Sequence, residues 1–287
     1  MNWFVFTLIS SISLSLRELS AKKAGRALSS AYMSWGINFF VFLIFLGITL
    51  VSSRTEPANI STFLKVLVLA AILDSLATLL YLSAIKHGDL SKTIPMLCFI
   101  PVVQLFVTPV LVHENLSLAG ITGVLVVVAG SYILNIEKWE GIFSPIKSIA
   151  KNKSSLMMLS TACIWGISSS FHKIGIRQTN PVFWGVCEIG LITLFLFPFA
   201  MRSETSPFSL EKIKKTMWPA AFSGLTVWSY YMAINMGPVA YVSSIRRLAV
   251  LFSMGIGVVI LGEKARRTGL LGGIIMIIGS VIICLLG

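Results

Sequence analysis

Apolar residues along this chain form long stretches separated by short polar segments, and they do not alternate with polar residues. Stretches such as 39–46 and 124–128 are apolar on every side, which is typical of a membrane-spanning helix and not of a membrane-spanning strand. About 20 such residues cross the hydrocarbon core of a bilayer. The pattern therefore predicts ten spanning helices, at residues 2–21, 30–51, 63–86, 93–112, 116–136, 154–176, 181–200, 217–236, 240–262 and 268–286.

A second pattern is an internal repeat that relates residues 76–133 to residues 225–282. Matched positions lie 149 residues apart, and the residues that recur are Tyr81, Ala84, Ile85, Gly88, Glu114, Gly120, Gly123, Gly130, Ser131 and Ile133. Each half holds five predicted helices, so the second half must enter the membrane from the opposite side. The predicted fold is an all-α integral membrane protein with ten transmembrane helices in two inverted five-helix repeats. The first repeat occupies residues 1–136, a polar linker 137–153 and the second repeat 154–287.

Composition supports a membrane protein, because 56% of residues are hydrophobic and only 12% are charged. The net charge of +12 would suggest a nucleic-acid partner in a soluble protein, but here the basic residues lie in short loops. Most of them follow odd-numbered helices, which places those loops in the cytoplasm and both termini outside. Residues 3–16 lack the basic flank and cleavage site of a signal peptide, so we expect a retained first helix.

The cysteine and histidine residues do not have the spacing of metal ligands. The cysteines lie within predicted spans and are interpreted as packing residues, namely Cys98, Cys163, Cys187 and Cys284. The histidines lie near helix ends on three different segments, at His87, His113 and His172. We therefore expect no metal site and no cofactor.

Small residues and two carboxylates recur in both halves and are interpreted as parts of the scaffold. Glycines permit close approach of helices in lipid, and the candidates are Gly120, Gly123, Gly130, Gly269, Gly273 and Gly279, with Ser131 and Ser280 beside them. Glu114 and Glu263 end the fourth and ninth spans. At that depth a carboxylate either reaches water or caps the helix that follows.

Several motifs together resemble the drug/metabolite transporter superfamily, and specifically its EamA-like branch. They are Trp165-Gly166 with Lys173 in the sixth span, Tyr-x-x-Ala at 81–84 and 230–233, and Leu-Gly-Glu at 261–263. The first half departs from the family pattern, because Leu14-Ser15 stands where Trp-Gly is expected. The resemblance implies a carrier of a bacterial inner membrane that works by alternating access. It also implies a central cavity lined by the first, third, fourth, sixth, eighth and ninth helices.

Ionisable residues inside the spans are the strongest candidates for function, because a charge facing lipid at mid-bilayer costs about 2.5–3.5 kcal/mol. Asp74 lies about 16 Å into its helix, a depth that suits either a proton relay or a buried hydrogen-bond partner. Glu188 and Arg246 lie at similar depths, about 10 and 9 Å, which permits an ion pair. Arg17 and Glu18 are close to a loop and form either a local interfacial pair or a functional one.

Arg246 and Arg247 are the candidates that are most readily assigned to function, because the repeat aligns them with uncharged Leu97 and Cys98. A residue needed for the scaffold would be expected in both halves. A guanidinium group binds carboxylate or phosphate with two parallel hydrogen bonds. The segment also resembles the basic pair in the ninth helix of sugar-phosphate translocators of the same superfamily, where the pair engages phosphate. The alternative is that both side chains extend to nearby headgroups.

These considerations give two sets of candidate site residues. The substrate-binding candidates are Arg246, Arg247, Trp165, Lys173, Glu188, Tyr81, Tyr230, Gln104 and Asn235, and the proton-coupling candidates are Asp74, Glu188 and Glu18. Aromatic residues among them can stack on a substrate, although Tyr and Trp also favour membrane interfaces.

The sequence therefore predicts a secondary transporter, an exporter of a small organic anion or zwitterionic metabolite, with protons as the candidate driving ion. An exchanger of phosphorylated metabolites or nucleotide-linked sugars is the alternative. The chain lacks a Walker A motif, and it lacks the H-E-x-x-H and G-x-S-x-G motifs of an intramembrane enzyme. We expect the lipid bilayer and a small-molecule substrate as partners, no nucleic acid, and a monomer or homodimer.

Overall fold

The computed structural model describes residues 2–24, 28–51, 56–87, 93–134, 152–203, 209–261 and 267–287. Within these ranges every regular element is a helix. The elements are α1 (Asn2–Ala24), α2 (Ser30–Val51), α3 (Ile60–His87), η2 (Ile94–Phe99), α5 (Ile100–Leu111), α6 (Leu118–Leu134), α8 (Lys153–Gln178), α9 (Pro181–Arg202), α10 (Leu210–Met236), α11 (Val239–Arg246), α12 (Ala249–Leu261) and α13 (Arg267–Leu286).

These elements confirm the ten predicted segments among the described residues. Two segments are each made of two helices, since η2 and α5 form the fourth and α11 and α12 form the ninth. In the described part of the chain, seven helices are long and apolar enough to cross a membrane by length and composition. The helix α10 begins at Leu210, about two turns before the predicted start. Most of the predicted linker, at 137–151, lies outside the described residues, as does Glu263.

The two broken segments are interrupted at matching places of the repeat. Phe99 ends η2, and its counterpart 149 residues later is Leu248, which lies between α11 and α12. In the first half, Pro95 and Pro101 lack the backbone N–H that a continuous α-helix requires. In the second half, Arg247 and Leu248 donate to carbonyl oxygens three residues earlier, not four. Helices broken at corresponding positions of two repeats mark substrate sites in secondary transporters.

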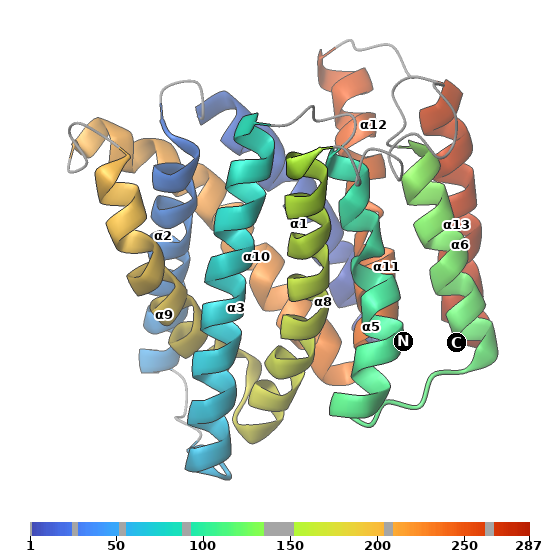
Figure 1. Cartoon of the computed structure of the whole chain (residues 1–287), viewed down its shortest axis with the longest axis horizontal. Coiled ribbons are helices and arrows are strands. Elements are labelled where there is room, and N and C mark those ends of the chain that lie inside the picture. Colours follow the sequence, from blue (N-terminus) through green and yellow to red (C-terminus); the bar gives the residue numbers. More distant parts are fainter. Residues whose placement is uncertain are drawn as a thin grey trace.

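The packing of the helices shows how the two halves are related (Figure 1). The closest pairs across the halves are α1 with α10, α3 with α8, α2 with α9, and α6 with α13. Exchanging the halves converts the first pair into the second and leaves the other two unchanged, as a two-fold axis would. The equivalent helices α3 and α10 run in opposite directions along the bundle, which confirms the inverted arrangement.

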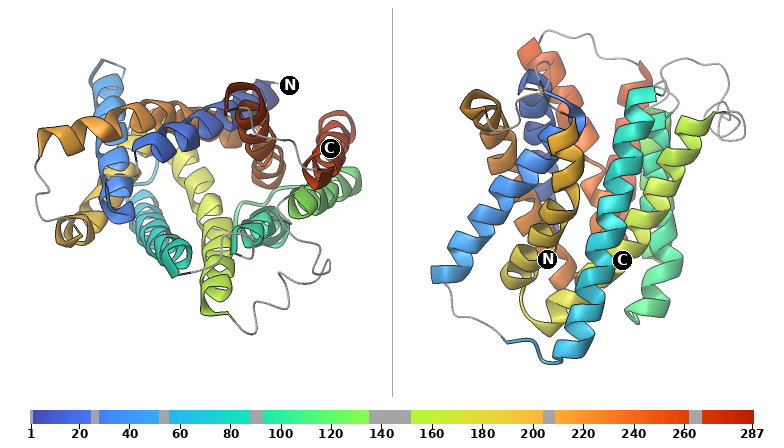
Figure 2. Two further views of the ribbon diagram at one scale, coloured as in Figure 1. Left: turned by 90° about the horizontal axis from the view of Figure 1, so that it is seen from above. Right: turned by 60° about the vertical axis from the view of Figure 1, so that its left-hand side comes forward.

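The helices α6 and α13 meet through glycines along their length. A Cβ atom built on Gly130 would lie 2.7 Å from the carbonyl oxygen of Gly272, and one on Gly279 would lie 2.8 Å from that of Gly123. Real Cβ atoms essentially never come so close, so only glycine allows this contact. The pair lies at one end of the bundle and α2 with α9 lie at the other, as both views show (Figure 2). The helices between these two pairs supply most of the residues of the site described below.

Candidate functional site

A cavity of about 620 Å³ lies between the two halves. Its wall includes residues from each helix that the family resemblance implied, and also from α2 and α9. It reaches Ala21 near the end of α1 and Ser30 at the start of α2. Those helix ends lie at the edge of the bundle opposite the labelled chain termini (Figure 1), so this is the mouth of the cavity. The opposite end, near the α8–α9 turn, is its floor.

Two guanidinium groups line the cavity beside the break in the ninth segment. Arg246 is the last residue of α11 and Arg247 follows it directly. The guanidinium carbon of Arg246 lies 4.5 Å from the ring centroid of Tyr230, which is a cation–π contact. The Nε atom of each arginine is buried without a hydrogen-bond partner, and neither side chain forms an ion pair with a described residue. Both therefore face the cavity with unused donors.

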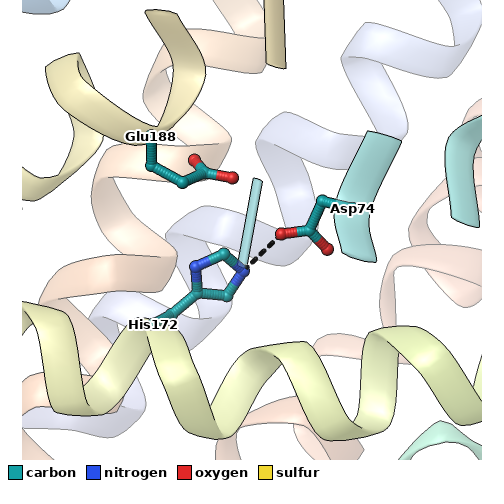
Figure 3. Close-up of side chains that lie close together, drawn as sticks. All are labelled: Asp74, His172 and Glu188. Carbon is teal, nitrogen blue, oxygen red and sulfur yellow. Dashed lines mark ion pairs between the residues drawn. The ribbon is translucent and has the colours of Figure 1, made fainter. Parts of the chain in front are cut away.

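The ion pair between Arg246 and Glu188 that their depths permit is not formed. Glu188 accepts a hydrogen bond from the Tyr231 hydroxyl at 2.8 Å and is only 2% exposed. It points toward Asp74 and His172 at the floor of the cavity (Figure 3). Helical geometry explains the outcome, because equal depth places two residues on one level of the bundle but does not orient their side chains.

Asp74, His172 and Glu188 form a buried acid–imidazole cluster, contributed by α3, α8 and α9. One ligand atom from each lies within 4.8 Å of the other two. The Nε2 atom of His172 is 3.1 Å from a carboxylate oxygen of Asp74, and Ser168 donates to the same oxygen at 2.8 Å. Asp74 is therefore a buried hydrogen-bond acceptor at the cavity wall. His172, which the sequence analysis did not include among the candidate site residues, is its partner.

Polar and aromatic candidates occupy the remaining wall. Gln104 donates to the Ser169 hydroxyl at 2.6 Å, while its Oε1 atom has no partner. Tyr81 and Trp165 lie together with ring centroids 5.6 Å apart, and both line the cavity. A planar substrate group could be held against such rings.

Near the mouth, the charged atoms of Arg17 and Glu18 lie 3.9 Å apart, which is the local pair that the sequence offered as one of two alternatives. Both also line the cavity. Glu18 accepts a hydrogen bond from Ser253 of α12 at 3.4 Å, which connects the first and ninth segments. The side chain of Glu18 is 52% exposed, in contrast to the buried acids Asp74 and Glu188 at the floor.

Two predicted substrate-binding residues do not line the cavity. Asn235 is exposed on the outside of α10. Lys173 is buried below the floor, where it forms a 2.6 Å ion pair with Glu114 and donates to the Gly237 carbonyl at 2.8 Å. Lys173 lies near the end of α8, as expected from the sequence. Its ammonium group is paired with Glu114 and is therefore not available to a substrate in the cavity.

Glu114 caps a helix, but not the one that follows it in the sequence. Both of its carboxylate oxygens accept from the backbone N–H of Val239, at 3.1 Å each, at the start of α11. A negative charge is favourable there because it faces the positive end of the helix dipole. His113 immediately before it has a φ of 56°, which is uncommon for a residue other than glycine.

Two cavity residues had a weak signal in the sequence. His172 follows Trp165 by seven residues and Ser168 by four, and such spacing places all three on one face of a helix. Tyr231 follows Tyr230 directly. The repeat matches Tyr230 with Tyr81, but it matches Tyr231 with Leu82, so it does not indicate Tyr231. The cluster itself joins residues that are 98 and 16 positions apart from His172 in the sequence, which no local pattern relates.

Comparisons with known proteins agree with this architecture. The sequence model of the EamA-like transporter family matches residues 1–136 and 152–285. Two proteins from different strains of Helicobacter pylori, each named "Uncharacterized transporter", are 26% and 25% identical over 137 residues, which is 45% of this chain. The alignment spans only 44% of the length of each relative. A solved structure titled "Crystal structure of protein" has a TM-score of 0.78 and 15% identity, covering 99% of this chain and 97% of that one. That likeness concerns the fold alone.

Proposed function

Because the chain belongs to the EamA-like transporter family, we propose that it is a secondary transporter that exports a small organic anion or zwitterionic metabolite by alternating access. The observation that carries the proposal is the pair of arginines in the cavity. Their Nε atoms are buried without partners, and an unpaired buried donor on a charged group is unfavourable. A carboxylate or phosphate group of a substrate would provide the missing acceptors.

The size of the cavity supports a small molecule as the substrate. Ligand pockets commonly have volumes of about 300–1,000 Å³, and this cavity has about 620 Å³. Trp165 and Tyr81 offer aromatic surface on the side of the mouth, while the unused Oε1 atom of Gln104 offers an acceptor. A zwitterion would use the cationic and the acceptor groups together.

Alternating access is supported by the contrast between the two ends of the cavity. At the floor, the ion pair between Lys173 and Glu114 ties α8 to the segment after α5, and Glu114 also binds the start of α11. Arg177 donates to the Val112 carbonyl at 3.1 Å beside it. These contacts must separate if the substrate is to leave through the floor. With the loop charges of the sequence, the mouth faces the cytoplasm, which is the entry side for an exporter.

Proton coupling is part of the proposal and concerns the acids of the cavity. Asp74 and Glu188 are 7% and 2% exposed, and buried carboxyl groups on the path of a transporter serve as proton sites. Glu18 is the third candidate, at the mouth. Binding of a proton at the floor would change the charge next to the substrate in each transport cycle.

An exchanger of phosphorylated metabolites is the second candidate function. It is favoured by the adjacency of Arg246 and Arg247, because two guanidinium groups suit a dianionic phosphate better than a single carboxylate. Arg17 adds a third cation to the same cavity. The two candidates differ in the substrate and share the same site.

The test is counterflow in liposomes containing the purified protein, with carboxylated, zwitterionic and phosphorylated metabolites. Arg246→Gln and Arg247→Gln are compared with Arg202→Gln, an exposed arginine at the end of α9. Loss of a charged hydrogen bond of about 1.5–3 kcal/mol lowers transport roughly 10- to 150-fold in a cavity variant and leaves the control unchanged. Arg246→Lys keeps the charge but loses the planar group, so it remains impaired. Unchanged transport in both cavity variants contradicts the proposal, and stimulation by phosphorylated compounds alone selects the second candidate.

A further inference from the structure

The acid–imidazole cluster has a hydrogen-bond pattern that restricts what it can bind. Asp74, His172 and Glu188 come from three helices, and each is less than one tenth exposed. Their spacing would suit either a metal ion or a proton. We propose that Asp74 and Glu188 together hold one exchangeable proton, and that Trp184 keeps His172 neutral, so that the cluster is a proton site and not a metal site. This deepens the proposed transport function by identifying the group that would carry the coupling ion.

Trp184 determines which ring nitrogen of His172 carries the proton. Its indole Nε1 lies 3.2 Å from Nδ1 of His172, and an indole nitrogen is a donor only. Nδ1 must therefore accept with its lone pair. The single proton of the neutral ring then lies on Nε2, which donates to Asp74 at 3.1 Å. An imidazolium ion would bring a second N–H against the N–H of Trp184, so protonation of His172 is disfavoured.

Trp184 cannot move aside to relieve that conflict. It is fully buried and its ring lies directly on Gly175 of α8, where an added Cβ atom would collide with the ring. The ring also makes an edge contact with Phe63, with centroids 5.9 Å apart. The position of the donor is thus set by the packing of α3, α8 and α9.

The same hydrogen bond opposes binding of a metal ion. A metal ligand at Nε2 needs the lone pair of that atom, which would transfer the proton to Nδ1. Histidine ligands normally donate that other N–H to an acceptor, but here the neighbour of Nδ1 in His172 is the donor of Trp184. Metal binding would therefore require the loss of a buried hydrogen bond and an unfavourable contact between two N–H groups.

The two carboxyl groups carry the exchangeable proton. Asp74 accepts from both His172 and Ser168, and Glu188 accepts from Tyr231. None of these donors is a cation when His172 is neutral, and two ionised carboxylates at this separation in a buried site repel strongly. A single proton removes the repulsion, as in other carboxylate pairs that share one site.

Charged and titratable groups around the cluster do not replace that proton. The cavity-lining ones outside the cluster come from α1, α3, α10, α11 and the residue directly after α11, and are Arg17, Glu18, Tyr81, Tyr230, Tyr231, Arg246 and Arg247. Arg246 lies over the ring of Tyr230, and among the described residues it forms no ion pair with Asp74 or Glu188. The cavity-lining polar residues of α2 and α5, such as Asn38 and Gln104, do not titrate. A substrate anion that binds Arg246 would thus lie in the same cavity as the carboxyl pair.

Infrared spectroscopy of the purified protein tests the shared proton without any transport assay. We expect one protonated carboxyl group near neutral pH that is lost in Asp74→Asn and in Glu188→Gln. Both variants retain an acceptor for the neighbouring donors, so the fold should persist, and circular dichroism checks this. The matched control is Glu211→Gln, whose carboxylate is 78% exposed and leaves the signal unchanged. Absence of a protonated carboxyl group in the wild type overturns the proposal.

Nitrogen NMR of labelled histidine, together with calorimetry using Zn²⁺, tests the role of Trp184. The His172 signal, identified by its loss in His172→Gln, should show the neutral form with the proton on Nε2 at every pH at which the protein stays folded. Trp184→Phe should let the ring become protonated on acidification. An imidazolium signal in the wild type, or Zn²⁺ binding that disappears in His172→Gln, overturns the proposal. If no transport is found but the protonated carboxyl group and the neutral His172 are observed, only the proposed function is contradicted. If transport depends on the arginines but those two signals are not observed, only the proton site is contradicted.

Discussion

The ion pair between Glu114 and Lys173 allows a quantitative test of what holds the floor of the cavity together. The two side chains are only 5% and 6% exposed, and their charged atoms are 2.6 Å apart. We expect Lys173→Met or Glu114→Gln alone to be strongly destabilising, because each leaves a buried group without its partner. The double variant, which removes both charges, should be little worse than either single variant.

The magnitude follows from the surroundings of each residue. Breaking a buried pair by removing one partner costs about 3–5 kcal/mol, whereas replacing both partners with neutral residues is often close to neutral. Lys173 keeps the Gly237 carbonyl as an acceptor, and Gln at position 114 keeps an acceptor for Val239, so the lower figure of about 3 kcal/mol is expected for each single change. If the effects were independent, the double variant would lose about 6 kcal/mol.

Equilibrium unfolding of the purified protein in mixed micelles, followed by circular dichroism, provides the four free energies of the cycle. The expected coupling energy is about 3 kcal/mol. Lys215→Met with Glu211→Gln is the matched control, because that pair has nearly the same separation, 2.7 Å, but is exposed and should show no measurable coupling. Additive effects at Glu114 and Lys173 would refute the view that their charges compensate each other.

Three further predictions concern packing and the limits of the site. Gly130→Ala should sharply lower the melting temperature, because its Cβ atom would meet the α13 backbone, whereas Gly47→Ala, with nothing within 4 Å, should be neutral or slightly stabilising; equal effects would contradict the glycine contact. Asn235→Ala should leave the transport rate unchanged, since the side chain is exposed on the outer surface, and a loss of uptake in liposomes would return this residue to the site. Tyr241→Phe should lower the unfolding free energy by about 1 kcal/mol, as measured in micelles, because its hydroxyl accepts from the Ser117 N–H at 2.9 Å; an unchanged value would show that this bond contributes nothing.

The spans and the inverted repeat could be predicted from the sequence. The spans are visible as continuous apolar stretches, and the repeat is visible as matched residues at a constant spacing of 149. The interruption of the fourth and ninth segments was less accessible. Pro95 and Pro101 signal it in the first half, but in the second half the break consists of a short change in hydrogen bonding around Arg247, with no proline to mark it. The equivalence of the two breaks appears only when the structure and the repeat are compared.

The depth of a residue within its membrane-spanning helix could be estimated from the sequence, but the direction in which its side chain points could not. Asp74 and Glu188 were expected in the interior and are there. Lys173 was expected to face the cavity, yet its ammonium group is bound below the floor by Glu114, which lies 59 positions earlier. Contacts of that kind depend on how helices rotate about their axes during packing, and rotation is set by the whole interface and not by one segment.

The glycine contact between α6 and α13 also bears on how the molecule moves. Backbones that touch without side chains between them leave no room for sliding or rotation, because any displacement brings carbonyl groups into collision. We therefore expect α6 and α13 to keep their positions relative to each other while the remaining helices tilt. Labels placed on α6 and α13 should keep a constant separation throughout the working cycle.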